Sequence, residues 1–293
     1  MTNAMLNDAP YFSLPLPPPP PTETTSERDV VNRVEAVFAE VDSLWELLEA
    51  PAPATPPIPT NELAPDLKVS VVIPVYNEKK TVLDVIASVK ALPFETEIIV
   101  VDDASTDGTR GWLETIRGAS GLKLILKDVN EGKGAALRDG FVVATGNIIV
   151  VQDADSEYDP RDIEKLIRPI ITGDADAVYG SRYLYRGDQQ QSLARRFANW
   201  GLTKASNWFS GLRLTDMETC QKAFRANVLR GLQLRQNRFG FEPEVTAKIA
   251  RRKYRVVERS VRYRARTRTQ GKKIGLLDGF NAMYCIARYG VRD

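Results

Sequence analysis

A pair of carboxylates beside an apolar run is the feature of this sequence best suited to chemistry. Asp153 and Asp155 stand at the end of the run NIIVVQD, and side chains two residues apart in an extended segment project to the same face. Hard oxygen ligands of this kind suit Mg²⁺ or Mn²⁺, which keep open positions for substrate phosphates. The tripeptide alone is weak evidence, because Asp174-Ala175-Asp176 repeats it. That second pair precedes an apolar run and is expected at the opposite edge of a sheet.

The residues that the chain lacks narrow the chemistry further. It has no histidine and two cysteines, Cys220 and Cys285. This composition excludes Ser-His-Asp and Cys-His nucleophiles, and metal sites built from imidazole or several thiolates. Acid–base and metal chemistry must therefore rest on carboxylates, Lys, Arg, Tyr or backbone groups. A calcium loop beginning at Asp153 is disfavoured, because Tyr158 stands where such a loop requires glycine.

Short β-branched runs alternate with helical stretches from Leu67 onward, which predicts a parallel sheet with helices on both faces. The predicted strands are 68–76, 96–103, 122–127, 147–153 and 176–182, and the predicted helices are 78–91, 107–117, 133–144 and 160–172. Ligands of such sheets bind at the carboxyl ends of the strands. Four successive strand ends carry the polar segments PVYNE, DDASTDGT, NEGKG and QDADSE. Each alone is ordinary turn chemistry, but together they indicate one site.

Charge divides the chain into an acidic and a basic part. Residues 1–180 hold 15 basic and 30 acidic residues, a balance of −15, whereas residues 181–293 hold 25 and 8, a balance of +17. The stretch 251–273 alone has eleven basic residues and one acidic residue. Such a patch indicates an anionic partner, namely a phosphorylated ligand, nucleic acid or an anionic membrane surface, unless it is simply a solvated face.

The first 66 residues differ from the rest. A proline-rich arm is followed by an amphipathic helix predicted over about 27–50, and a second proline-rich segment links it to the body. The apolar stripe of this helix could serve self-association, packing on the main domain, or contact with a membrane or partner helix. No apolar run is long enough to span a bilayer and no signal peptide is evident, so we expect a cytoplasmic protein. Peripheral contact with the cytoplasmic membrane face stays open.

The motifs PVYNE, VVDDASTDGT, NEGKGAALRDG, VVQDADSEYDP and VYGSRY, in this order, resemble the family-2 glycosyltransferases with a GT-A fold. The branch that makes dolichyl- or polyprenyl-phosphate mannose and glucose is the most similar. The resemblance runs from about Val69 to Phe280. It implies an α/β fold with a mostly parallel central sheet, a nucleotide-sugar and metal half at 67–182, and a basic acceptor half at 183–293.

The resemblance also implies roles for individual residues of the first half. Binding of the nucleotide sugar falls to Pro74, Tyr76, Asn77, Glu78, Asp103, Lys133, Asp153 and Ala154. Asp153 and Asp155 match the D-x-D that holds the metal, Mg²⁺ or Mn²⁺, and the sugar diphosphate. Glu157 is a third candidate ligand, although close relatives usually have Gln there. Asp155 and Arg182 are the expected catalytic residues of this half, with Arg182 facing the phosphates.

The acceptor half is less settled by the sequence. The segment 268–273 resembles a mobile phosphate-binding loop with one residue fewer, and the expected acceptor-binding residues are Arg266, Arg268, Lys272 and Lys273. Asp216 matches an acidic position that is either a catalytic base or a residue that orients the acceptor. The final stretch, 274–289, reads as an amphipathic helix suited to core packing or to in-plane membrane contact.

The resulting hypothesis is an inverting, metal-dependent transfer of a hexose from a UDP- or GDP-sugar to a polyprenyl phosphate. A lipid phosphate is already ionised and needs no general base, which suits a chain without histidine. One alternative keeps the enzyme but uses a soluble hydroxyl or glycan acceptor with Asp216 as base. Another is a nucleic-acid-binding protein that uses the basic stretch 251–273. Sparse aromatic residues there disfavour it, so we expect no nucleic-acid partner.

Overall fold

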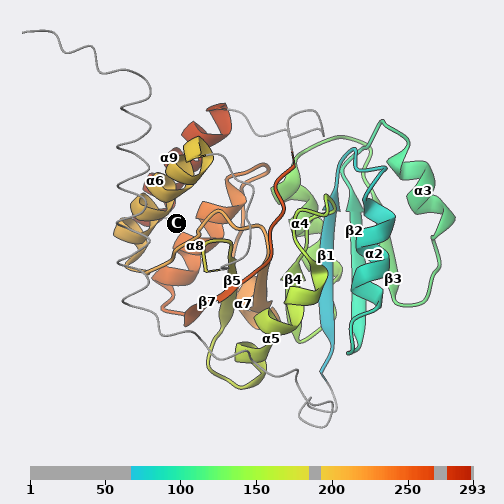
Figure 1. Ribbon diagram of the computed structural model, residues 1–293, viewed down its shortest axis with the longest axis horizontal. Coiled ribbons are helices and arrows are strands. Elements are labelled where there is room, and N and C mark those ends of the chain that lie inside the picture. Colours follow the sequence, from blue (N-terminus) through green and yellow to red (C-terminus); the bar gives the residue numbers. More distant parts are fainter. Residues whose placement is uncertain (1–66, 185–192, 267–275, 292–293) are drawn as a thin grey trace, which may run out of the picture. The chain divides into compact units, whose positions relative to one another are not determined.

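The computed structural model describes residues 67–184, 193–266 and 276–291, which form a mixed sheet between layers of helices (Figure 1). Within these residues the sheet has seven strands in the order β3-β2-β1-β4-β6-β5-β7. The strands are β1 (Val69–Val75), β2 (Thr96–Asp102), β3 (Leu122–Leu126), β4 (Ile148–Val151), β5 (Ala177–Ser181), β6 (Lys222–Arg225) and β7 (Val256–Ser260). The five predicted strands are confirmed, each with ends within two residues of the prediction.

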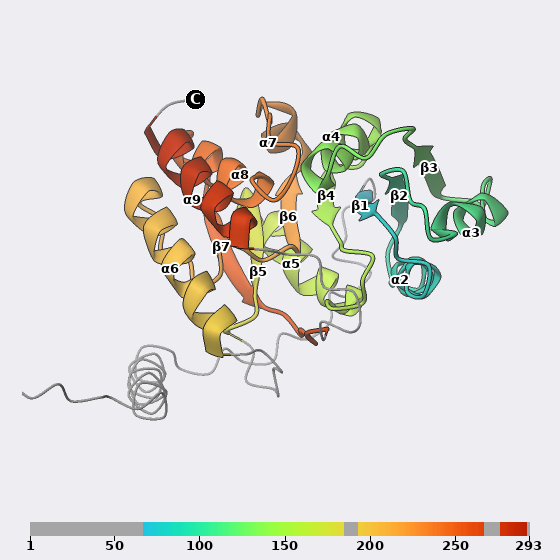
Figure 2. The same cartoon turned by 90° about the horizontal axis from the view of Figure 1, so that it is seen from above.

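The helices are α2 (Val82–Lys90), α3 (Thr109–Thr115), α4 (Lys133–Val143), α5 (Ile163–Ile171), α6 (Leu193–Ser210), α7 (Ala226–Arg230), α8 (Phe241–Arg251) and α9 (Leu276–Val291). The short 3₁₀ turn η1 (Pro160–Asp162) leads into α5. Apolar side chains of α2, α3 and α5 pack on one face of the sheet, and those of α4, α7 and α8 pack on the other. Figures 1 and 2 show α6 and α9 beside α8 at the end of the sheet that carries β5 and β7.

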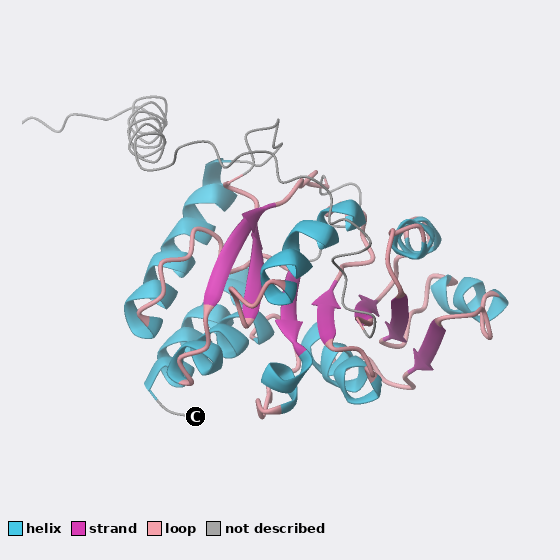
Figure 3. Cartoon of the chain, turned by 90° about the horizontal axis from the view of Figure 1, so that it is seen from below, coloured by secondary structure: helices cyan, strands magenta, loops and turns pink. Residues whose placement is uncertain are grey.

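The sheet departs from an all-parallel arrangement at one strand. β6 runs antiparallel to both β4 and β5, whereas the remaining pairs are parallel. β6 consists of the four residues KAFR, too short and too basic to be recognised as a strand. Because β6 lies between β4 and β5, it separates the strand that ends at the carboxylate pair from the strand that ends at Arg182 (Figure 3).

Two predicted features lie at the ends of the chain. The arm, helix and linker predicted over residues 1–66 lie outside the described residues. The final helix is confirmed as α9 over 276–291. Across the described parts of the chain, no helix is long and apolar enough to cross a membrane.

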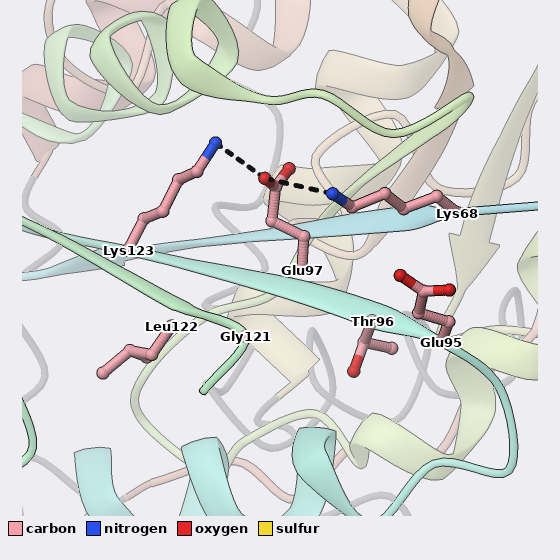
Figure 4. A pocket seen from close by; sticks show the side chains of 7 residues that line it. All are labelled: Lys68, Glu95, Thr96, Glu97, Gly121, Leu122 and Lys123. Atoms are coloured by element: carbon pink, nitrogen blue, oxygen red, sulfur yellow. Dashed lines mark ion pairs between the residues drawn. The ribbon is translucent and has the colours of Figure 1, made fainter. Parts of the chain in front are cut away.

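The amino-terminal edge of the sheet contains a buried ionic cluster around Glu97 (Figure 4). Its carboxylate accepts hydrogen bonds from Ser70 Oγ at 2.6 Å, the Thr145 backbone N–H at 2.8 Å and the Thr145 hydroxyl at 2.9 Å. Lys123 Nζ lies 2.7 Å from Glu97 Oε1. Burial alone would raise the pKa of Glu97, but these donors lower it from the usual 4.5 to about 2. The cluster joins β1, β2 and β3 to the chain before β4, at the edge opposite the strand ends that carry the predicted site.

We expect Glu97→Gln to lower the free energy of unfolding by about 1–2 kcal/mol at pH 7, because each pKa unit is worth 1.36 kcal/mol but solvent screens the partly exposed Lys68 and Lys123. Because the folded pKa is depressed, this stabilisation is complete above about pH 4.5 and is lost as the pH falls toward 2. Urea unfolding of both proteins between pH 7 and pH 3 measures the effect. The exposed Glu114→Gln is the matched control. A difference between wild type and Glu97→Gln that is constant with pH would contradict the assignment.

Candidate functional site

The turns after β1 and β2 are held together by reciprocal hydrogen bonds. The Asn77 backbone N–H donates to Ser105 Oγ at 2.9 Å, and the Thr106 N–H donates back to Asn77 Oδ1 at 2.7 Å. The Glu78 N–H donates to Thr109 Oγ1 at 3.0 Å. Asn77 has a positive φ of 55°, which asparagine tolerates better than most residues. Of the other residues predicted here, Pro74 lies within β1 and Tyr76 is 37% exposed just beyond it.

Asp103, which follows β2, organises the loop before α4. Its carboxylate oxygens accept from the backbone N–H groups of Glu131 at 3.1 Å and Gly132 at 2.7 Å. Lys127 Nζ lies 3.2 Å from the same carboxylate. Asp103 is 2% exposed, so these contacts compensate the burial of its charge. The second and third strand ends thereby form a single surface.

Lys133, the first residue of α4, lies between two carboxylates. Its Nζ is 2.9 Å from Asp153 Oδ1 and 3.2 Å from Glu242 Oε1. Burial opposes the charge of Lys133, but Asp153 and Glu242 raise its pKa well above the usual value. Burial likewise opposes the charge of Asp153, and the Lys133 ammonium nevertheless lowers the pKa of Asp153. This pair is therefore ionised at neutral pH.

Asp155 ionises less readily than Asp153. Burial raises its pKa to about 7, and the negative charges of Asp153 and Glu157 act in the same direction. The Arg266 guanidinium, 3.0 Å from Asp155 Oδ2, offsets part of this effect. Arg266 therefore does not fully offset the burial of Asp155 and the repulsion from its neighbouring carboxylates. Ala154, between the two aspartates, is 3% exposed.

Glu157 connects the carboxylate pair to the segment after β7. Tyr263 donates its hydroxyl to Glu157 Oε2 at 2.7 Å, and the Arg266 N–H donates to Oε1 at 2.8 Å. The Arg264 N–H donates to the Glu157 carbonyl at 2.8 Å. Arg266 also binds Glu78 through two hydrogen bonds of 2.8 and 3.0 Å. Arg266, expected to bind the acceptor, thus lies directly at the carboxylate pair, whereas Arg268, Lys272 and Lys273 fall outside the described residues.

Arg182, which follows β5, is fixed by Asp216. Its Nε and Nη2 donate to the two Asp216 oxygens at 2.7 Å each, and its backbone N–H donates to Oδ2 at 3.0 Å. Asn199 Nδ2 also donates to Asp216 Oδ1 at 3.2 Å. Asp216 is fully buried, and both of its carboxylate oxygens accept hydrogen bonds from Arg182. The geometry therefore makes Asp216 the residue that orients Arg182.

Sequence reasoning missed three residues that hold this arrangement. Glu258 on β7 accepts from the Thr215 N–H at 2.8 Å and the Asp216 N–H at 3.0 Å, which fixes the segment that carries Asp216. Glu242 pairs with Lys133, and Asn199 on α6 contacts Asp216. The sequence does mark Glu258, because it is the one acidic residue in the basic stretch 251–273. No local pattern marks Glu242 or Asn199.

The residues present fit a divalent cation. Asp153 and Asp155 are separated by one residue and are each 17% exposed. The negative charges of Asp153 and Glu157 contribute to the raised pKa of Asp155, which a cation at the pair would relieve. Mg²⁺ is commonly bound by one or two carboxylates together with substrate phosphates. In the described parts of the chain, no three acidic or cysteine side chains form a metal cluster. The oxygens of Glu157 face Tyr263 and Arg266, which leaves Asp153 and Asp155 as the candidate ligands.

Comparison with known proteins decides the family. The family described as "Glycosyl transferase family 2" matches residues 70–232, more than half of the chain. The chain belongs to glycosyl transferase family 2. Undecaprenyl-phosphate mannosyltransferase of Micrococcus luteus is 29% identical over 234 residues, which cover 77% of this chain and 95% of that protein. Undecaprenyl-phosphate 4-deoxy-4-formamido-L-arabinose transferase of Aeromonas hydrophila is 30% identical over 226 residues, 75% of this chain and 67% of that protein.

Solved structures confirm the GT-A fold of this glycosyltransferase. Glucosyl-3-phosphoglycerate synthase from Mycobacterium tuberculosis, in complex with UDP, superposes with a TM-score of 0.60 at 22% identity and covers 78% of this chain and 81% of its own. A mannosyltransferase from Pyrobaculum calidifontis, in complex with GDP-Man and Mn²⁺, gives a TM-score of 0.53 at 22% identity and covers 78% and 64%. At these identities the comparison establishes the fold alone.

We expect Gly134→Ala to displace Lys133, because a Cβ at residue 134 would overlap the Gln236 carbonyl oxygen. Overpacking of this kind costs about 1–3 kcal/mol in unfolding free energy, and transferase activity should fall with it. Gly111→Ala in α3 is the matched control, since a Cβ there meets no atom within 4 Å. Denaturant unfolding and donor turnover measure both variants. Wild-type stability in Gly134→Ala would contradict the close approach of the 236–238 segment to α4.

Proposed function

We propose that this glycosyltransferase transfers a hexose from a UDP- or GDP-sugar to a polyprenyl phosphate with inversion at the sugar C1. The observation that carries the proposal is the pair Asp153 and Asp155 at the end of β4, flanked by Lys133 and Arg266 in a family-2 chain. Two relatives are named as transferases of undecaprenyl phosphate, and the chain covers most of the length of each. These relatives favour a lipid phosphate as the acceptor.

The donor would lie along the first four strand ends. We assign Tyr76, Asn77, Glu78 and Asp103 to the nucleotide, with Pro74 and Ala154 shaping the backbone around it. Lys133 and Asp153 would contact the diphosphate region. A divalent cation bound at Asp153 and Asp155 would stabilise the negative charge on the departing diphosphate. Arg266 sits where it could release Asp155 when the cation and phosphates arrive, because it also has Glu78 as a partner.

The reaction needs little proton transfer. An oxygen of the acceptor phosphate forms a bond to C1 as the C1–O bond to the nucleoside diphosphate breaks, and the bonding pair leaves with the diphosphate. The acceptor phosphate is already ionised, so no base is required. We assign Arg182 to the phosphates near C1, since Asp216, Asn199 and the ring of Tyr263, 5.1 Å from its guanidinium carbon, fix its orientation.

The two alternatives for the acceptor half lose support from the contacts. Asp216 as a base for a soluble hydroxyl acceptor would first have to give up its bonds to Arg182. Nucleic-acid binding would have fewer basic groups available than the sequence suggests, because Arg255 pairs with Asp176 and Arg262 with Asp162. These arginines of the basic stretch serve the fold.

We expect Asp155→Asn to reduce transfer by at least about a thousandfold, comparable to loss of a major electrostatic contribution. The neutral amide cannot share the charge of a divalent cation. The measurement is release of UDP or GDP from a panel of nucleotide sugars with Mg²⁺ or Mn²⁺, repeated after chelation. Asp174→Asn is the matched control, because Asp174 belongs to the second D-x-D and is exposed. Full activity in Asp155→Asn would overturn the cation assignment.

We expect Asp216→Asn to remove transfer and to lower the unfolding free energy by about 3–5 kcal/mol, the usual cost of breaking a buried ion pair. A separate assay identifies the acceptor of the wild type by extracting the radiolabelled product into organic solvent. A product that enters the organic solvent supports a lipid phosphate acceptor. A water-soluble glycoside, with Asp216→Asn as stable as wild type, would instead favour Asp216 as base for a hydroxyl acceptor.

A further inference from the structure

Helices α6 and α9 expose large apolar side chains in regular rows. On α6, Phe197 is 56%, Trp200 42% and Trp208 81% exposed. On α9 the exposed row comprises Phe280, Met283, Tyr284 and Val291. Spacings of three, four, seven and eleven residues place each row on one side of its helix. We call these seven side chains the aromatic face.

The opposite sides of the same helices pack into the body. On α9, Ala282, Cys285, Ile286 and Tyr289 are buried, and α9 contacts both α6 and α8. A Cβ at Gly290 would lie 2.7 Å from Phe209 Cβ, so the glycine permits close approach of α9 to α6. Figure 2 shows the two helices as neighbours at the outer end of the molecule. Isolated exposed apolar residues are ordinary, but two rows on adjacent helices mark an interaction surface.

The charge of α6 indicates the sign of the partner. The helix carries Arg195, Arg196 and Lys204 and has no acidic residue. Lys204 is exposed and lies one turn from both Trp200 and Trp208. Aromatic side chains interleaved with basic ones are typical of helices that lie in the interface of an anionic bilayer.

Helix α6 also connects this face to the candidate site. Asn199 projects from the buried side of α6 and hydrogen-bonds to Asp216, while Arg182 Nη2 donates to Asn199 Oδ1 at 3.3 Å. Phe197 and Trp200 flank Asn199 in sequence, and their rings stack with centroids 5.7 Å apart. The surface that bears the aromatic face therefore begins within one helical turn of the residue that fixes Arg182.

We propose that the aromatic face of α6 and α9 lies in the plane of an anionic lipid bilayer and brings the site to its acceptor. The inference rests on the proposed function, because a polyprenyl phosphate is delivered from a membrane. A second copy of this chain is the less suitable occupant. A two-fold contact through the aromatic side of α6 would bring Lys204 of both copies together without an acidic residue on that helix.

The test is flotation of the full-length protein with vesicles of phosphatidylglycerol and phosphatidylcholine in equal parts, and with phosphatidylcholine alone. We expect binding to the anionic vesicles that weakens with salt. Combined Trp208→Ala and Phe280→Ala substitutions should weaken it at least about tenfold, because each removes a large apolar side chain from the interface. Trp112→Ala on α3, 46% exposed in the wild type, is the matched control and should bind as the wild type does.

Transfer assays separate this inference from the proposed function. The ratio of transfer to polyprenyl phosphate in anionic vesicles over transfer to a water-soluble short-chain prenyl phosphate should fall about tenfold in the double variant. Equal ratios in wild type and variant would overturn the docking face while leaving the lipid phosphate acceptor intact. Absence of transfer to either acceptor would overturn the proposed function. A dimer in light scattering that the double substitution dissociates, without vesicle binding, would assign the face to self-association instead.

Discussion

Pairing of acidic groups from the first half with basic groups from the second half is the interaction on which the site depends. Arg266 binds Glu78 and Asp155, and Arg262 pairs with Asp162. An isolated antiparallel β-bridge between Tyr158 and Tyr263, and the hydrogen bond from Tyr263 to Glu157, join the same two segments. The pair of Arg182 and Asp216 also joins the halves, with the basic group in the first half. Removing either partner would leave a buried charge without compensation, which costs more than the pair itself contributes. Part of the basic excess of the second half is therefore used in internal pairing with the acidic first half.

The same pairing explains how a crowded group of carboxylates stays folded. Asp153 relies on Lys133, whereas Asp155 has a pKa near 7 and shares Arg266 with Glu78. Arg266 belongs to the chain that leads directly to the segment expected to close over phosphates. A cation and a diphosphate entering together would supply the charges that this arginine now provides. Under the proposed function, donor binding would therefore be linked electrostatically to the position of the 263–266 segment.

Much of the fold, and the meeting of several strand-end residues at one edge of the sheet, follows from the sequence. Apolar runs such as 96–102 are long, β-branched and bounded by turns, so their strands are recognisable locally. β6 was missed because its four residues are held by two neighbouring strands rather than by a pattern of their own. Residues next to strand ends, such as Asp103 and Asp153, were identified by position. Glu242 and Asn199 reach the site from helices distant in sequence, and a three-dimensional contact leaves no local signature.

The hydrogen bonds of the carboxylates near Arg182 bear on how a chain without histidine could catalyse transfer. Three carboxylates around Arg182 have tasks in the fold: Asp216 orients Arg182, Glu258 holds the Asp216 segment, and Glu157 anchors Tyr263. A carboxylate that accepts such bonds cannot abstract a proton without releasing its partner. A nucleophile that arrives already ionised avoids that cost. The arrangement of charges therefore favours a phosphate acceptor for the same reason that it keeps the site intact.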